Sequence, residues 1–310
     1  YNVAIVELGN EPVDLYAHGY PAAKTALGYA DLATSAAAAM SAEDPALEFC
    51  GVGEGTFSAA DWVSLVPMLD DWNELAFSGT HSLTPSVDGA QGHYYSYFGY
   101  SADERTLFEY LMAGGEAARA TKAEIDALTS FLPYRLTEYN VTVEESGVGI
   151  HPEFMTQFQA GLAAADILLA MIDDGAAGAH IFNLSEAVGF GLLVRNTSWE
   201  LRPTGHAFSL LSPLADDERV TAASSDAPIR TVAAGSGNVP TGLAVPILDV
   251  LATLNSETGR PRLVVLNKSY SDDHTLLVDF DRDFSGTVAV RRFESADLAA
   301  DNETAQNATV

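Results

Sequence analysis

The sequence predicts an α/β fold, with a parallel sheet covered by helices, followed by a small antiparallel β domain. Two observations lead to this prediction. Up to about residue 200, short apolar runs alternate with long helical segments, which is typical of parallel sheets. Beyond that point helical periodicity fades, and short strand-like runs are separated by turns rich in Gly, Asp, Asn and Ser. The alternation alone fits a doubly wound sheet and a barrel equally well.

The first part of the chain is predicted to run β-α-β-α-β-α-β-α-β. Short apolar runs that stop at Gly or at polar residues predict buried strands at 2–8, 46–52, 132–139 and 179–184. Apolar residues spaced three and four apart predict helices at 22–41, 59–74, 102–128 and 153–174. The third strand has two candidate positions, 75–81 and 90–98.

Alternating apolar and polar residues predict the strands of the second part. They are expected at 228–234, 262–268, 274–281 and 286–293. This pattern is typical of an antiparallel sandwich. The predicted domains are therefore a sheet-and-helix domain at 1–200, a β-sandwich at 201–298, and a final strand or tail at 299–310.

The composition excludes several partners. The chain holds 15 basic and 43 acidic residues, with a net charge of −28, so it should repel nucleic acid and anionic membranes. No apolar run is long enough to cross a membrane. The histidines are scattered and Cys50 is the single cysteine, which predicts a buried thiol, no disulfide within the chain, and neither metal nor cofactor.

Six N-x-S/T sequons indicate a secreted glycoprotein. They exceed the number that chance would give in a chain with so few asparagines. Two of them, at Asn140 and Asn183, lie in or near predicted strands. Glycans are expected on the other four, Asn196, Asn267, Asn302 and Asn307. An export signal, if the protein has one, would lie upstream of Tyr1.

Two glutamates stand where predicted parallel strands end. Glu11 follows the first strand within Gly9-Asn10-Glu11-Pro12, and Glu138 closes the fourth within Thr137-Glu138-Tyr139-Asn140. The carboxyl ends of parallel strands meet at one edge, so both side chains would point into one cleft. Glycoside hydrolysis needs such a pair, one carboxyl group protonated and the other ionised.

These two motifs resemble those of glycoside hydrolase clan A. The resemblance implies a (β/α)8 TIM barrel in which the first and fourth strands predicted here are barrel strands four and seven, so that strands four to eight are present. It also implies that Glu11 is the acid/base, that Asn10 contacts the sugar 2-hydroxyl, and that Glu138 is the nucleophile.

Further segments are similar to α-L-arabinofuranosidases of this clan. Residues 199–211 (WELRPTGHAFSLL) resemble the segment that leaves the barrel and enters the sandwich, and 298–310 resemble the closing strand. The first motif, read as 7–16 (ELGNEPVDLY), is also similar to the β-glucuronidase and heparanase-like members. The resemblance is specific for the clan and looser for the family.

Other residues are candidates for binding the sugar. His93 and Tyr95 resemble an H-x-Y segment of the sixth barrel strand, where the Tyr often touches the nucleophile, and His81 competes for this place. Tyr139 and Trp199 are candidate stacking platforms. Asn183 faces the substrate if it carries no glycan.

A barrel that begins at strand four lacks three strands. We therefore expect an N-terminal chain or segment, or an oligomer, to complete the barrel around a carbohydrate substrate. The alternative function is a non-catalytic matrix or filament glycoprotein, or a carbohydrate-binding one, that keeps a hydrolase fold.

Overall fold

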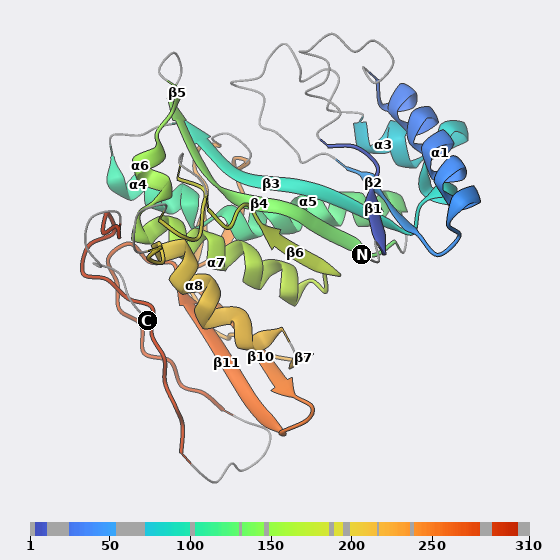
Figure 1. Cartoon of the computed structure of the whole chain (residues 1–310). Helices are drawn as coiled ribbons and strands as arrows, with labels where there is room; N and C mark the ends of the chain where they lie inside the picture. Colours follow the sequence, from blue (N-terminus) through green and yellow to red (C-terminus); the bar gives the residue numbers. More distant parts are fainter. Residues whose placement is uncertain are drawn as a thin grey trace.

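Five strands of the computed structural model form one parallel sheet, in the order β1-β2-β3-β4-β6 (Figure 1). They are β1 (Ile5–Glu7), β2 (Glu48–Val52), β3 (Gly89–Gly99), β4 (Tyr134–Glu145) and β6 (Gly178–Ile181). A short strand, β5 (Gly149–Ile150), pairs antiparallel with the end of β4. The structure describes residues 4–10, 25–53, 72–99, 103–129, 132–145, 149–185, 189–194, 199–215, 217–235, 239–279 and 287–302.

Helices between the strands pack side by side. Consecutive ones are in contact, α1 with α3, α3 with α5 and α5 with α7, while α5 also contacts β3 and α7 contacts β4. Their bounds are α1 (Ala26–Glu43), α3 (Trp72–Phe77), α4 (Glu104–Leu111), α5 (Gly114–Thr129), α6 (Pro152–Met155) and α7 (Phe158–Asp173). The main core lies between these helices and the sheet. Five parallel strands with intervening helices fit part of a TIM barrel.

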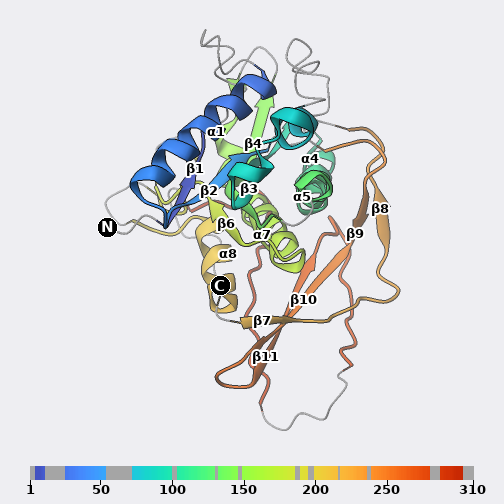
Figure 2. The same ribbon diagram turned by 90° about the vertical axis from the view of Figure 1, so that its right-hand side faces the viewer.

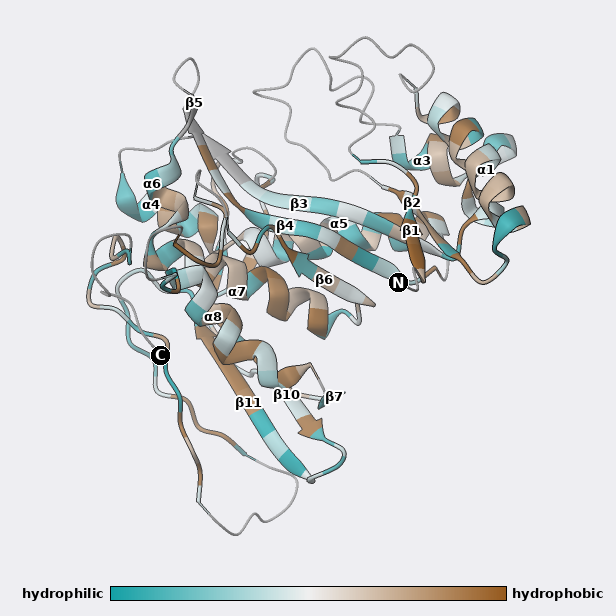
Figure 3. Cartoon of the chain, viewed as in Figure 1, coloured by the Kyte–Doolittle hydropathy of each residue, from teal (hydrophilic) through white to brown (hydrophobic). Residues whose placement is uncertain are grey.

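The third strand lies at the second of its two predicted positions. The strand expected at 75–81 is wrong, because this segment holds the end of α3 and a 3-10 turn at Gly79–His81. Trp72, Ala76 and Phe77 form the buried face of α3, and their spacing is that of a helix. Gly79, which follows the helix, has a φ of +74°. Figure 3 shows why β3 is hard to recognise: it is mostly pale or teal, whereas β1 and β2 are brown.

Two helix predictions also need correction. The helix expected at 102–128 is divided into α4 and α5 by a turn at Met112–Ala113. The helix expected at 59–74 falls mostly outside the described residues, and only its end overlaps α3.

The C-terminal part forms two antiparallel sheets. One has the order β11-β10-β7 and the other pairs β8 with β9. The bounds are α8 (Pro203–Leu211), β7 (Asp217–Val220), β8 (Ile229–Thr231), β9 (Ala244–Pro246), β10 (Leu248–Asn255) and β11 (Arg260–Asn267). Leu169 of α7, Leu211 of α8 and Leu251 of β10 share an apolar cluster. Figure 2 shows β7, β10 and β11 beyond α7 and α8, away from the parallel sheet.

The strand predictions for this part are only partly correct. β8 and β11 lie within or near the expected 228–234 and 262–268, whereas β7, β9 and β10 were not expected. The strands expected at 274–281 and 286–293 are absent from the described residues 274–279 and 287–293. Leu277, Val288 and Val290 are largely exposed there, so their alternation does not bury a face.

The last described residues return to the helices. The N–H groups of Phe158 and Gln159, at the start of α7, donate to the carbonyls of Ala300 and Leu298. The Phe158 ring stacks against Phe293, with ring centres 4.6 Å apart. This segment therefore caps α7 instead of forming a free tail.

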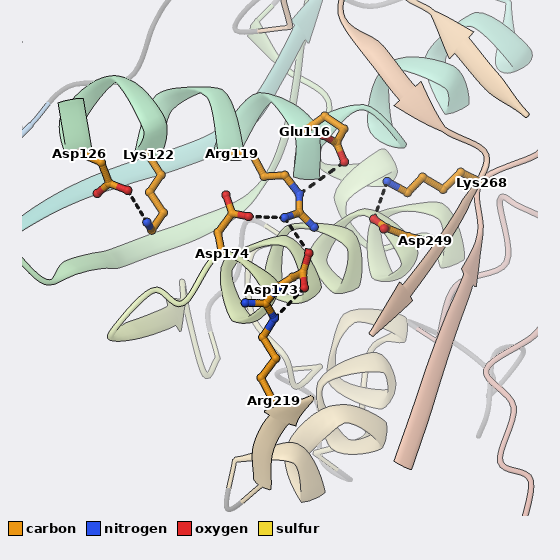
Figure 4. A network of polar contacts seen from close by, with 9 residues as sticks. All are labelled: Glu116, Arg119, Lys122, Asp126, Asp173, Asp174, Arg219, Asp249 and Lys268. Atoms are coloured by element: carbon orange, nitrogen blue, oxygen red, sulfur yellow. Dashed lines mark hydrogen bonds and ion pairs between the residues drawn. The ribbon is translucent and has the colours of Figure 1, made fainter. Parts of the chain in front are cut away.

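A buried ion cluster joins α7 to the C-terminal strands. Figure 4 shows the contact between two of its members, Lys268 and Asp249. Lys268, just after β11, places its Nζ 2.5 Å from Asp166 Oδ1 of α7 and 3.0 Å from Asp249 Oδ2 of β10. Asp166 also accepts a hydrogen bond from the Gly115 N–H at 2.8 Å. Burial opposes the charge on Lys268, but the two carboxylates outweigh it and raise the pKa of the ammonium group.

Candidate active site

Glu138 lies on β4 beside polar residues of β3. The strand continues past it to Glu145, so the prediction that Glu138 closes this strand is wrong. The Tyr95 hydroxyl donates a hydrogen bond to Glu138 Oε2 at 2.6 Å. His93 Nδ1 lies 3.7 Å from the same oxygen. The hydroxyl and the imidazole thus approach the same carboxylate oxygen. The predicted H-x-Y pair is therefore assembled around Glu138.

A bulge in β4 turns Glu138 towards these partners. Gly92 pairs with Leu136, but His93 pairs with Glu138, so Thr137 is an extra residue between the two pairs. Without it, Glu138 would share a face with Leu136, which is buried in the main core. The extra residue places Glu138 on the opposite face, with His93 and Tyr95.

Aromatic contacts hold Tyr95 in place. Its ring meets Phe182 and Phe190 edge to face, with centres 6.2 and 5.7 Å apart. Asn140, the residue opposite Tyr95 on β4, donates from Nδ2 to the carbonyls of Phe182 and Phe190. The Asn140 amide is thus buried and occupied, and the sequon at this position is not open to a glycan.

β1 brings a second carboxylate to the same group. Glu7 Oε1 lies 3.3 Å from His93 Nε2. His93 is only 8% exposed, whereas the side chains of Glu7 and Glu138 are 32% and 26% exposed. The imidazole therefore lies between two carboxylates that remain partly open to solvent. Glu7 was not among the predicted site residues, although it lies in the quoted motif four residues before Glu11.

The predicted acid/base, Glu11, lies outside the described residues. Asn10, the residue before it, is described and exposed, and it follows β1 through Gly9, whose φ is +117°. A positive φ suits glycine, and it lets the chain turn sharply as it leaves the strand.

Two predicted binding residues do not reach the site. His81 belongs to the 3-10 turn beside α1, where its Nδ1 lies 3.1 Å from Asp31 Oδ1, so the prediction for His81 is wrong. Tyr139 is fully buried in the main core, and burial raises the pKa of its hydroxyl group. It therefore cannot serve as a stacking platform.

Asn183 lies just after the end of β6, the strand near which it was expected. It follows Phe182, whose ring contacts Tyr95, and its N–H and C=O pair with Phe190 and Leu192. Its Oδ1 is buried and has no hydrogen-bond partner among the described residues. Trp199 is 54% exposed and has a φ of +53°.

The predicted glycosylation sites differ in accessibility. Asn267 is exposed, and its amide bonds locally to the backbone of Ser269 and Asp272. Asn302 is fully buried and its Nδ2 donates to the Leu201 carbonyl at 2.9 Å, so the prediction of a glycan there is wrong. Asn196 and Asn307 lie outside the described residues.

The remaining reactive groups of the described residues do not form a second site. Cys50 is buried on β2, and burial raises the pKa of its thiol, as an inert structural cysteine requires. Within the described ranges no group of three or more His, Cys, Asp or Glu is placed to hold a metal ion. No helix found there has the length and apolar character needed to span a bilayer.

Solved structures provide the comparison, since no family model and no curated protein matches the sequence. The chain is similar to the α-L-arabinofuranosidase of Thermotoga maritima, with a TM-score of 0.57 and 19% identity over 84% of this chain and 51% of that one. A family 51 α-L-arabinofuranosidase from Bifidobacterium longum gives a TM-score of 0.72 and 15% identity, over 98% and 61%.

A family 44 xyloglucanase from Paenibacillus polymyxa is also similar, with a TM-score of 0.54 and 15% identity over 86% of this chain and 54% of that one. The chain shares the fold of these three hydrolases over part of their length. It spans little more than half of these proteins. At such identities the comparison speaks for the fold, and the chemistry must be argued from the site.

Proposed function

We propose that this chain supplies the catalytic groups of a retaining glycoside hydrolase similar to α-L-arabinofuranosidases. The observation that carries the proposal is Glu138, hydrogen-bonded by Tyr95 and facing His93, on a parallel sheet whose first strand leads into Asn10 and Glu11. The hydrolase folds of the similar proteins support it. No observation favours the matrix-glycoprotein alternative.

The mechanism we propose is a double displacement. Glu138, ionised and held by Tyr95, attacks the anomeric carbon, while Glu11 donates its proton to the leaving glycosidic oxygen. The glycosyl ester formed on Glu138 is then cleaved by water, whose proton returns to Glu11. The sugar keeps its anomeric configuration, and both carboxyl groups regain their starting states. Asn10 would bind the sugar 2-hydroxyl.

We further propose that these five strands are barrel strands four to eight and that the C-terminal sheets belong to a β-sandwich. Among the described residues, β1 pairs only with β2, and β6 only with β4. Ile5 of β1 is 41% exposed, which is unusual for a strand of a closed barrel. An upstream segment or a separate chain carrying three βα units would cover both edges. Secretion and glycosylation at Asn267 belong to the same proposal.

The test is hydrolysis of aryl glycosides by the chain together with the three upstream βα units. We expect release of nitrophenol from 4-nitrophenyl α-L-arabinofuranoside, with the retained anomer as first product by NMR. Glu138→Ala should abolish turnover. Glu11→Ala should also lose turnover, and added azide should restore it. If Glu138→Ala hydrolyses as fast as the wild type, the assignment is wrong.

A further inference from the structure

Three strands bring Glu7, His93 and Glu138 into one row. Glu7 lies at the end of β1, His93 on β3 and Glu138 on β4. His93 Nε2 is 3.3 Å from Glu7 Oε1, and His93 Nδ1 is 3.7 Å from Glu138 Oε2. Each ring nitrogen therefore faces a different carboxylate. Neither contact has the geometry of a hydrogen bond, so the carboxylates act on the ring through their charge, which favours the imidazolium.

We propose that Glu7 is a positioning residue, which keeps His93 protonated and aimed at Glu138. The inference rests on the proposed function, because Glu138 is taken as the nucleophile. Glu7 acts on Glu138 through the imidazole: its charge favours the imidazolium, whose Nδ1–H faces the carboxylate that must stay ionised to attack.

Burial makes this arrangement effective. His93 is 8% exposed, so its interaction with Glu7 is screened less than a surface pair would be. Glu7 itself reaches solvent, and it can therefore carry its charge without the cost of full burial. A neutral residue at position 7 would remove the carboxylate that lies 3.3 Å from His93 Nε2.

Other titratable groups around the row have their own partners. On β2, Cys50 is opposite Glu7 in the strand register, and Arg135 of β4 lies 3.5 Å from its sulfur. Arg135 also lies 3.9 Å from Glu48, at the other end of β2. On β3, Tyr95 donates to Glu138. Glu7 is the carboxylate of β1 that lies against His93.

The direct test is the protonation of His93, followed by NMR in protein labelled with 15N-histidine. His93→Gln assigns its signals. We expect Glu7→Gln to lower the titration midpoint of His93 by about one pH unit, the effect of losing one close opposite charge. Glu7→Asp keeps a retracted charge and should give a smaller decrease. Glu48→Gln, a carboxylate of the neighbouring strand, should leave the midpoint unchanged.

Kinetics then separate positioning from mere proximity. In the complete protein, Glu7→Gln should reduce kcat about tenfold with little change in KM. The alkaline limb of its pH profile should move to lower pH, in step with His93. A shifted His93 midpoint with an unchanged kcat profile would overturn the positioning role.

The outcomes distinguish this inference from the proposed function. If the wild type cleaves no glycoside but the His93 midpoint still depends on Glu7, the proposed function fails and the electrostatic contact stands. If the midpoint is the same in wild type and Glu7→Gln, the inference fails whatever the activity. Should Glu7→Gln not fold, Glu7→Asp decides, since an unchanged midpoint in that variant overturns the inference as well.

Discussion

Two clusters of this molecule surround a basic side chain with carboxylates, and they differ in burial. In the buried ion cluster between α7 and the C-terminal strands, Lys268 and Asp166 are both fully buried, and their charged atoms lie 2.5 Å apart. In the proposed active site, His93 lies 3.3 Å from Glu7 and 3.7 Å from Glu138, and both carboxylates are partly exposed.

This difference in burial separates a cluster that stabilises the fold from one that can react with a substrate. A fully buried ion pair has already lost its water, so removing one partner leaves a charge that nothing compensates. Such a cluster can join two parts of a fold, but a substrate cannot reach it. Carboxylates at looser distances and in contact with solvent contribute less to stability, and they are free to meet a sugar. The predictions below test this division of roles.

The largest effect is expected for Lys268→Met. Asp166 and Asp249 would remain without their cation, one of them fully buried, and the free energy of unfolding should fall by about 3–5 kcal/mol. Urea denaturation measures this loss. The control is Lys122→Met, since Lys122 pairs with the half-exposed Asp126 one helical turn away and should cost less than about 1 kcal/mol. Equal losses in the two variants would contradict the comparison.

Gly115→Ala should disturb the same cluster from the side of α5. A Cβ at this position would lie 2.7 Å from the carboxylate of Asp166, which Lys268 holds in place. We expect a loss of about 1–3 kcal/mol, as for other overpacked sites. Gly178→Ala is the control, because its nearest neighbour would be 3.4 Å away. In a Lys268→Met background the cost should shrink; full additivity would show that Lys268 does not hold Asp166.

Tyr95→Phe tests the proposed active site without disturbing its packing. The ring keeps its contacts with Phe182 and Phe190, but Glu138 loses a hydrogen bond. We expect kcat to fall about tenfold, since a hydrogen bond to a charged group contributes roughly 1.5 kcal/mol, while the thermal midpoint changes little. Tyr110→Phe removes a hydroxyl that donates to the Ala234 carbonyl and should leave kcat unchanged. The same kcat loss in both variants would contradict a specific role for Tyr95.

The sequence predicts the parallel strands best where apolar residues run together. β1 and β2 are recognisable for this reason, although β1 is partly exposed, and β6 and the start of β4 lie within or close to their predicted ranges. β3 is ambiguous because Gln91, His93 and Tyr95 interrupt its apolar pattern. His93 and Tyr95 belong to the proposed site, so the local signal is weakest where function is expected.

The site was only partly predictable for a geometric reason. Glu138 and its H-x-Y partners follow from motifs, but the bulge at Thr137, which turns Glu138 to their side, depends on pairing between two strands. Glu7 was missed because its role depends on a contact with His93 across β2. Likewise, the burial of Asn302 against Leu201 is a long-range contact that a sequon cannot reveal.

The smallest effect is expected at the exposed edge of the ion network. Arg219 of β7 lies 2.9 Å from Asp173 and is 53% exposed, and Asp173 also has Arg119 as a partner (Figure 4). Arg219→Ala should therefore cost less than about 1 kcal/mol in urea denaturation. This loss should become smaller in 1 M NaCl, where the screening length is about 3 Å, whereas the loss in Lys268→Met should persist. If the loss at Arg219 does not depend on salt, this pair stabilises the fold in the same way as the buried cluster. Exposure would then not distinguish the charged groups that stabilise this fold from those that can react.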